Sequence, residues 1–327
     1  MIPTLSLSLI FEALDPVHIP GFSGSVWRGA FGYALKRVAC VMRMRPCEGC
    51  PLESSCVYTT IFDTRPVPGE GLFTATARAP HPFALVPEAD CAVLAPGERL
   101  ALGLTLAGRT AAWAPVALRA FAEAGERGVG WGRGRLALAE VRGNDDTLLW
   151  CPGEVLRSPG ATLPPLPPLP RRARLMIKTP LRLKRGGRLV RPDEFALPDL
   201  ITAVGRRVSE FSIHYGDGPL RQDFRVLKEA ARSLPLSCRD LAWREFRRYS
   251  TRQRQWLPMG GIVGSAGLDF GTAIDAAEAL WPFLIVGARI GAGKAVTMGF
   301  GVYDVIAEDD LIAADGQCAR APRLGSW

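Results

Sequence analysis

Four cysteines in the first part of the chain have the spacing of metal ligands. Cys40, Cys47, Cys50 and Cys56 form the pattern C-x6-C-x2-C-x5-C. The C-x2-C pair supplies two thiolates from one turn, and the flanking thiolates complete a tetrahedral set of four sulfur ligands. We predict a structural zinc site, because four protein ligands leave no open position for a substrate. An iron–sulfur cluster accepts the same thiolates, and reduced, metal-free cysteines are the third interpretation.

A glycine-rich stretch near the C-terminus carries two cations. Residues 287–301 contain five glycines together with Arg289 and Lys294. Glycine reaches positive φ and lets the backbone approach a ligand closely, so the stretch is a candidate phosphate contact. It matches neither a P-loop nor a dinucleotide fingerprint, because the required glycine and Ser/Thr positions are not occupied. A turn that only packs a helix against a strand explains the glycines equally well.

The basic residues of the chain are clustered. The formal net charge is +8, nine Lys or Arg lie within 171–191, and five Arg against one Glu lie within 244–254. Such clusters are typical of nucleic-acid binding, whereas solvated surface charge is the simpler alternative. A membrane surface is a weaker interpretation, since neither cluster lies on a basic amphipathic helix.

The start of the chain alternates like a strand and has no basic n-region. The longest apolar run, 279–286, is too short to span a bilayer. We therefore expect a cytoplasmic protein without a membrane partner, in which the eight cysteines do not form a disulfide framework.

The expected secondary structure repeats. A strand at 98–106, a helix at 114–124, a glycine-rich loop at 125–134 and a strand at 135–141 end the first half. A strand at 260–270, a helix at 272–286, the loop at 287–301 and a strand at 297–305 end the second. This self-similarity indicates a tandem duplication of one α+β unit.

Each half opens differently. The first begins with a strand at 4–11 and a helix from Val26 to about Val41, capped by Ser23 or Ser25. The second begins with a strand at 172–179 and a basic hairpin at 181–190. Two helices, 197–211 and 219–232, follow, and then aromatic residues alternate with arginines from 243 to 256. Aromatic rings among arginines can stack bases while the cations contact phosphates.

A proline-rich stretch separates the two halves. Seven prolines within 152–170 predict an extended, semi-rigid spacer. It divides the chain into an N-terminal unit, 1–151, with a cysteine-rich insertion at 40–56, and a C-terminal unit, 171–306. A polar tail, 307–327, follows and is expected to be loosely ordered.

The second half resembles the RAMP superfamily of CRISPR systems, and within it the family of repeat-RNA (pre-crRNA) processing endoribonucleases. The matching residues are RYSTRQR at 248–254, LPMGGIVG at 257–264 and the loop GAGKAVTMGFG at 291–301. Residues 22–32, with the cysteines that follow, resemble one branch of the family. The resemblance covers roughly 170–305 well and 20–60 moderately. It implies two ferredoxin-like βαββαβ domains in tandem, the first with a metal-binding insertion that holds the four cysteines.

The resemblance also implies an activity and partners. The family cleaves within CRISPR repeats of a precursor transcript without a catalytic metal, and the product is a mature guide RNA that often stays bound. The expected partners are CRISPR repeat RNA, guide RNA and other CRISPR effector subunits. Attack by the 2′-OH leaves a 2′,3′-cyclic phosphate and requires a base, an acid and donors for the phosphorane charge.

The candidate catalytic residues are few, because the chain has three histidines. His18 lies in the region where some members of the family place their acid–base group, and His214, beside two glycines, is its rival. His81 precedes Pro82 and is expected to be structural. Arg28 and Lys36, on the first helix, are the candidates for stabilising the phosphorane.

The expected RNA contacts lie in the second half of the chain. They are basic side chains of the hairpin, the arginine-rich segment and the glycine-rich loop, together with two loop amides: Arg182, Lys184, Arg185, Arg188, Arg248, Arg252, Arg254, Arg289, Gly291, Gly293 and Lys294. Two other functions stay open. One is a non-catalytic RAMP subunit that binds guide RNA in an effector complex, and the other is a zinc-stabilised interaction protein with incidental basic patches.

Overall fold

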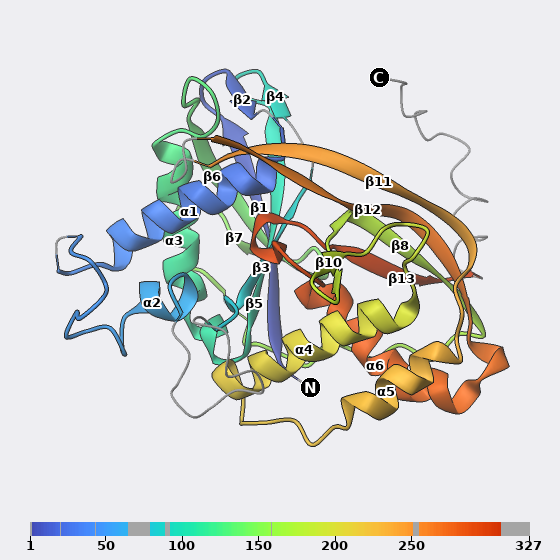
Figure 1. The fold of residues 1–327 in the computed structure, drawn as a ribbon. Helices are drawn as coiled ribbons and strands as arrows, with labels where there is room; N and C mark the ends of the chain where they lie inside the picture. Colours follow the sequence, from blue (N-terminus) through green and yellow to red (C-terminus); the bar gives the residue numbers. More distant parts are fainter. Residues whose placement is uncertain are drawn as a thin grey trace.

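The computed structural model describes residues 2–19, 21–42, 44–64, 79–88, 92–157, 159–250 and 255–308. It contains two larger antiparallel sheets, one from each half of the chain, lying side by side with their helices (Figure 1). Among the described helices, none is long and apolar enough to cross a membrane. The predicted RNA contacts Arg252 and Arg254 and most of the predicted tail lie outside the described residues.

The first sheet has the strand order β3-β5-β1-β6-β7. Its central strand β1 (Thr4–Ala13) alternates apolar and polar residues and pairs with β5 (Arg99–Ala107) and β6 (Leu136–Gly143). The edges are β3 (Phe83–Pro87) and β7 (Leu148–Trp150). Helices α1 (Ser23–Ala39) and α3 (Ala114–Glu126) pack on the apolar side, where Phe31 stacks on Phe121 with ring centroids 4.2 Å apart.

The second sheet has the strand order β11-β12-β8-β13. Its strands are β8 (Arg172–Leu181), β11 (Ser237–Ser250), β12 (Gln255–Asp269) and β13 (Tyr303–Ala307). The helices of this half are α4 (Leu197–Tyr215), α5 (Phe224–Arg232) and α6 (Ile274–Ile290).

Short elements connect these layers. They are β2 (Val17–Ile19), α2 (Val57–Ile61), β4 (Ala92–Leu94), β9 (Lys184–Arg185) and β10 (Arg188–Leu189), and the 3-10 turns η1 (Gly108–Trp113), η2 (Phe270–Thr272) and η3 (Val296–Met298).

Both halves repeat one arrangement, as the sequence predicted. Along the chain the main elements run strand, helix, strand, strand, helix, strand, from β1 to β6 and again from β8 to β13. Within each sheet these four strands lie in the order second, third, first, fourth. Each half also has its own hydrophobic core.

Several predicted boundaries are wrong. Helix α4 continues to Tyr215 and so includes His214, while α5 begins at Phe224 rather than at 219. Helix α6 continues to Ile290, and a Cβ on its Gly287 would lie 2.1 Å from the Tyr303 hydroxyl, so that glycine serves helix packing. The strand predicted at 297–305 is the turn η3 followed by β13. The N-cap of α1 is Phe22, without a side-chain cap bond, rather than Ser23 or Ser25.

The proline-rich stretch is fixed to both halves. Thr162 exchanges two backbone hydrogen bonds with Thr4 of β1, at 2.8 and 3.0 Å. Further on, the indole Nε1–H of Trp281 donates to the carbonyl of Pro167 at 2.7 Å. The described part of the stretch therefore lies against the two units although it contains no helix or strand.

Buried polar contacts hold the two units together. Arg207 of α4 donates from Nε to the Ile290 carbonyl at 2.9 Å and from Nη2 to the Phe83 carbonyl at 3.2 Å. The Tyr215 hydroxyl donates to the Pro80 carbonyl at 2.8 Å. Because water is withdrawn from the Arg207 guanidinium, its pKa is lowered to about 10.

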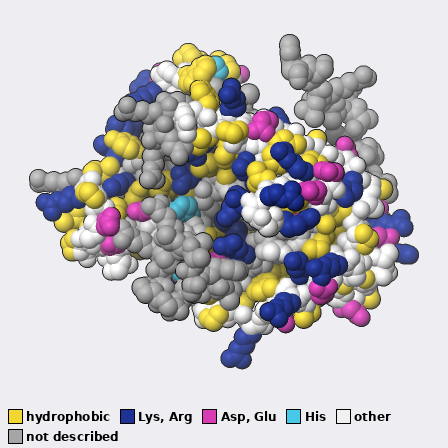
Figure 2. Space-filling view, in the orientation of Figure 1, with side chains coloured by type: hydrophobic (Ala, Val, Ile, Leu, Met, Phe, Trp, Pro, Cys, Tyr) yellow, Lys and Arg dark blue, Asp and Glu magenta, His cyan; other side chains and the backbone are white. Residues whose placement is uncertain are grey.

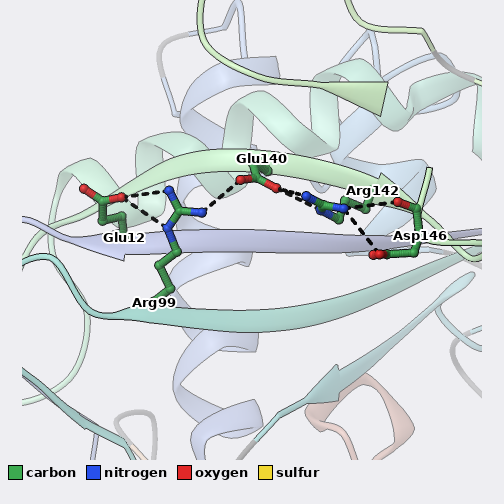
Figure 3. Close-up of polar contacts among 5 residues, drawn as sticks. All are labelled: Glu12, Arg99, Glu140, Arg142 and Asp146. Carbon is green, nitrogen blue, oxygen red and sulfur yellow. Dashed lines mark hydrogen bonds and ion pairs between the residues drawn. The ribbon is translucent and has the colours of Figure 1, made fainter. Parts of the chain in front are cut away.

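The outward side of the first sheet carries a network of ion pairs (Figure 3). Arg99 contacts Glu140 at 2.9 Å and Glu12 at 3.2 Å, and Arg142 contacts Glu140 and Asp146. Exposed pairs of this kind contribute little to stability. They do neutralise the arginines on this sheet, so the excess positive charge lies elsewhere.

Candidate nucleic-acid interface

A basic cleft lies between the β9–β10 hairpin and helices α4 and α5. Its volume is about 750 Å³. The cations that line it are Arg182, Lys184, Arg185, Arg206, Arg207, Lys228, Arg232 and Lys294, and its acids are Asp199 and Glu210. In Figure 2, Lys and Arg side chains gather over the part of this face where Figure 1 draws the β9–β10 hairpin. We call this site the basic cleft.

Of the two acids of the basic cleft, Asp199 is hydrogen-bonded through both oxygens, whereas Oε1 of Glu210 is buried without a hydrogen-bond partner among the described residues. Asp199 accepts a 2.9 Å hydrogen bond from Arg185 and also binds the backbone N–H of Ala196. Glu210 lies 3.4 Å from the His214 imidazole. The pKa of Lys294 lies below its ordinary value, because the ammonium group is desolvated and faces Arg206 and Lys184. Cations held together in this way favour a polyanionic ligand.

The glycine-rich loop places Lys294 in this cleft. Gly293 has φ +79°, and a Cβ there would lie 2.4 Å from the carbonyl of Arg182. The backbone N–H of Lys294 donates to the same carbonyl at 2.9 Å, and that of Ala292 donates to Gly301. The glycines therefore let the loop pack against the end of β8, and this packing brings a cation into the cleft. The packing interpretation is confirmed for Gly293, and the phosphate contact stays a prediction.

A second cationic group lies where the two units meet. Arg28 of α1 donates from Nε to the Thr297 hydroxyl at 3.1 Å, and its guanidinium lies 4.7 Å from the centre of the Phe62 ring. Burial, together with the nearby Arg248 cation, keeps the pKa of Arg28 below its ordinary value. Neither arginine forms an ion pair with a described residue. We call Arg28 and Arg248 the seam arginines.

The predicted catalytic histidines do not meet at the seam arginines. His214 is 4% exposed, its carbonyl accepts a 2.6 Å hydrogen bond from Arg109, and its imidazole faces Glu210. This burial argues against contact with a substrate. His18 is exposed on β2, where its ring meets that of Trp131.

His81, which the sequence indicated as structural, lies closer to the seam. Its ring stacks on that of Phe62 with centroids 5.8 Å apart, and the Arg28 guanidinium lies over the same Phe62 ring. Of the three histidines, it alone shares a contact partner with Arg28 within the described part of the chain.

The other predicted residues are distributed over different surfaces. Arg182, Lys184, Arg185, Gly293 and Lys294 line the basic cleft. Arg188 is exposed on β10 outside the cleft lining, and Arg289 contacts Asn144 of the β6–β7 turn. Gly291, with φ +73°, ends α6.

The four cysteines line one small cavity of about 170 Å³, together with Lys36 and Tyr58. Burial raises the pKa of the Cys47 thiol. Four thiols around one cavity fit a tetrahedral sulfur site in their chemistry. However, no three metal-binding side chains among the described residues are arranged as ligands. The metal therefore stays a prediction, and Lys36 lies with the cysteines rather than with Arg28.

The comparisons with known families divide the chain as its fold does. Residues 2–161 match a family described as an N-terminal domain. Residues 175–303 match the family described as CRISPR-associated endoribonuclease Cas6. The chain is therefore similar to Cas6 endoribonucleases in its C-terminal unit. No curated protein sequence matches it.

Solved Cas6 structures share the fold over nearly the whole chain. A Cas6 product complex has a TM-score of 0.54 and 20% identity, covering 93% of this chain and 99% of that one. Thermus thermophilus Cas6 has a TM-score of 0.52 and 19% identity, covering 94% and 99%. A partial Cas6–RT–Cas1–Cas2 complex has a TM-score of 0.56 and 13% identity, covering 93% of this chain and 46% of that one.

The sequence missed half of the cations in the basic cleft. Arg206, Arg207, Lys228 and Arg232 come from α4 and α5, outside the two basic clusters. A signal was present, since Asp199, Thr202, Arg206 and Glu210 recur at helical spacing and form one polar face of α4. This polar face becomes one wall of the cleft only because α4 packs beside α5 and the β9–β10 hairpin.

Proposed function

We propose that this chain is a metal-independent endoribonuclease that cleaves CRISPR repeat RNA in the precursor transcript and yields mature guide RNA. The match of residues 175–303 to the family of CRISPR-associated endoribonuclease Cas6 supports the class of reaction. The strand order of both sheets supports two ferredoxin-like units in tandem. In this proposal, repeat RNA and the guide RNA product are the ligands, and other CRISPR proteins are partners.

The observation that carries the proposal is the pair of seam arginines. They are half-buried, lie close enough to lower the pKa of Arg28, and meet no described acid. Two guanidinium groups in such a place favour a phosphate, whose oxygens accept bidentate hydrogen bonds. A phosphorane carries more negative charge than the phosphodiester, so the pair stabilises the transition state more than the ground state.

The chemistry requires a base for the 2′-OH and an acid for the leaving 5′-oxygen. A histidine supplies either at neutral pH. The geometry favours His81 for this role over the sequence candidates, because His214 is buried and His18 contacts a different surface. The basic cleft then binds the phosphates of the repeat RNA away from the cut.

The cofactor proposal is a structural zinc ion bound by Cys40, Cys47, Cys50 and Cys56. Their common cavity and sulfur chemistry support it. Zinc would there fix a segment between α1 and α2 that has few buried apolar residues. The cleavage chemistry uses no metal.

Cleavage in the presence of a chelator tests this function. Repeat RNA from the CRISPR array of the same organism, labelled at its 5′ end, is incubated with the protein in excess EDTA. The expected products end in a 2′,3′-cyclic phosphate and begin with a 5′-hydroxyl. No cleavage, or cleavage that needs added Mg²⁺, would contradict the proposal.

One observation favours the second candidate, a non-catalytic subunit that only binds guide RNA. Neither His18 nor His214 lies with the seam arginines. That function predicts tight binding of the repeat RNA without a cut. It also predicts that alanine at His81 or His214 leaves this binding unchanged.

A further inference from the structure

An exposed aromatic pair lies at the tip of the N-terminal unit, apart from the residues used above. Trp131, in the loop between α3 and β6, is 62% exposed. Its ring meets that of His18 edge-on, with centroids 5.0 Å apart and an interplanar angle of 71°. Val93, paired with His18 across β2 and β4, is 75% exposed. Figure 2 shows hydrophobic side chains and a histidine at the top of the molecule, where Figure 1 draws β2 and β4.

The backbone holds this pair in place. The N–H of Trp131 donates to the carbonyl of His18 at 2.7 Å, and Val129 pairs with Gly134 across the loop. Gly130 has φ +70°, and a Cβ there would lie 2.2 Å from the same His18 carbonyl. The loop is therefore built around β2 and presents the indole in one position. A ring ordered before binding loses little entropy when a ligand stacks on it.

The charge beside the pair is positive. Arg133, in the same loop, is exposed and forms no ion pair with a described residue. Arg135 is different, because its guanidinium is bound by Asp15 at 2.7 Å. An aromatic face next to an uncompensated cation suits a nucleotide, whose base stacks while its phosphate contacts the cation.

The chain segment that follows His18 contacts strand β11, which carries Arg248. Immediately after β2, a Cβ on Gly21 would lie 3.6 Å from the carbonyl of Arg247. The ring of Phe22 contacts that of Phe246 with centroids 5.2 Å apart. The arginine-bearing strand β11 therefore runs past the segment that joins the tip to α1.

We propose that Trp131 and His18 form a stacking platform for an unpaired nucleobase of the bound RNA, with Arg133 contacting the adjacent phosphate. This inference rests on the proposed function, since it takes an RNA ligand as given. It assigns His18 to binding rather than to proton transfer. The charge and the continuity with β11 favour RNA over a protein partner on the same tip.

Stacking is measured with a single-stranded oligoadenylate that carries one 2-aminopurine at successive positions. In the wild-type protein, quenching of 2-aminopurine fluorescence is expected at the stacked position. Trp131→Ala should abolish that quenching and weaken binding by roughly 5- to 150-fold, whereas Trp131→Phe should retain most of both. Arg133→Ala should reduce the salt slope of the affinity by about 0.7.

Trp113→Ala is the matched control, because Trp113 is an exposed indole of the same unit, 39% exposed. It should bind and quench as the wild type does, with melting curves of all variants superimposing. Equal affinity and equal quenching for Trp131→Ala and Trp113→Ala would overturn the stacking proposal without affecting the proposed function. The exposed pair would then be a candidate contact for a protein partner. If the wild type binds CRISPR repeat RNA but not the oligoadenylate, the platform alone fails; if it binds neither, the proposed function fails, and the platform with it.

Discussion

The Nε–H of Arg28 donates to the Oγ1 of Thr297 across 3.1 Å, although the two residues lie 269 positions apart in the chain. This bond joins the first helix of the N-terminal unit to the turn η3 in the loop of the C-terminal unit. It orients the Arg28 guanidinium beside Arg248. Contact between the two units therefore forms the pair of Arg28 and Arg248, which neither unit contains alone.

Arg28→Ala should reduce the rate of RNA cleavage by about 100- to 1000-fold, because a preorganised donor to the developing phosphorane charge is lost. The measurement is the single-turnover rate at saturating repeat RNA in EDTA. Arg37→Ala, on the same helix, removes a cation that pairs with Glu123 and should cleave normally. Thr297→Val removes the hydrogen bond and keeps the guanidinium, so its loss should be smaller. A normal cleavage rate for Arg28→Ala would exclude a catalytic role for the seam arginines.

His81→Ala should lower the same cleavage rate by about 100- to 10,000-fold, the contribution of a general acid or base. His214→Ala should alter thermal stability rather than the cleavage step, since His214 is buried against Glu210. Comparing the rates of the three alanine variants identifies the proton-transfer residue. A large loss confined to His18→Ala at saturating RNA would refute the assignment to His81.

Gly24→Ala should destabilise the protein, because a Cβ at Gly24 would lie 2.0 Å from the backbone carbonyl oxygen of Met298. Overpacking of this kind lowers the free energy of unfolding by about 1–3 kcal/mol. Gly29→Ala, on the same helix, meets nothing within 4 Å and should raise it by roughly 0.8–1 kcal/mol through helix propensity. Urea denaturation gives both values, and equal midpoints for the two variants would contradict the packing of α1 on η3.

Lys184→Ala and Lys294→Ala should weaken RNA binding and flatten its salt dependence. Each removed phosphate contact lowers the slope of log affinity against log salt by about 0.7–0.9. Affinities measured by anisotropy over a range of salt concentrations give that slope. Arg119→Ala is the control cation, because Arg119 pairs with Glu126 on α3. An unchanged slope in both lysine variants would exclude the basic cleft as a phosphate site.

Purified protein should contain about one equivalent of zinc per chain, bound by the four thiolates. Elemental analysis measures the metal, and Cys50→Ser should lose it together with thermal stability. Cys151→Ser is the control, because Cys151 does not line the cysteine cavity. Less than about half an equivalent of zinc or iron would leave reduced cysteines as the correct interpretation.

The sequence determined the repeated order of elements and predicted the class of ligand. Alternation in β1 and helical spacing in α1 are local patterns, so each predicted its element. The basic hairpin and the glycine-rich loop likewise marked two walls of the cleft, because Arg182 and Lys294 belong to unusual stretches of sequence. Net charge and clustering predicted an anionic partner without any knowledge of the fold.

Tertiary structure alone decided which of these groups meet. Arg28 and Arg248 lie in different units, and their proximity depends on packing of α1 against η3. His214 precedes two glycines and was a candidate for catalysis, but α4 continues through it and buries it. His81 and Trp131 carried no sequence signal, because a contact with Phe62 or His18 is made across the chain. Local patterns specify elements, whereas a site is assembled by long-range packing that no single stretch of sequence encodes.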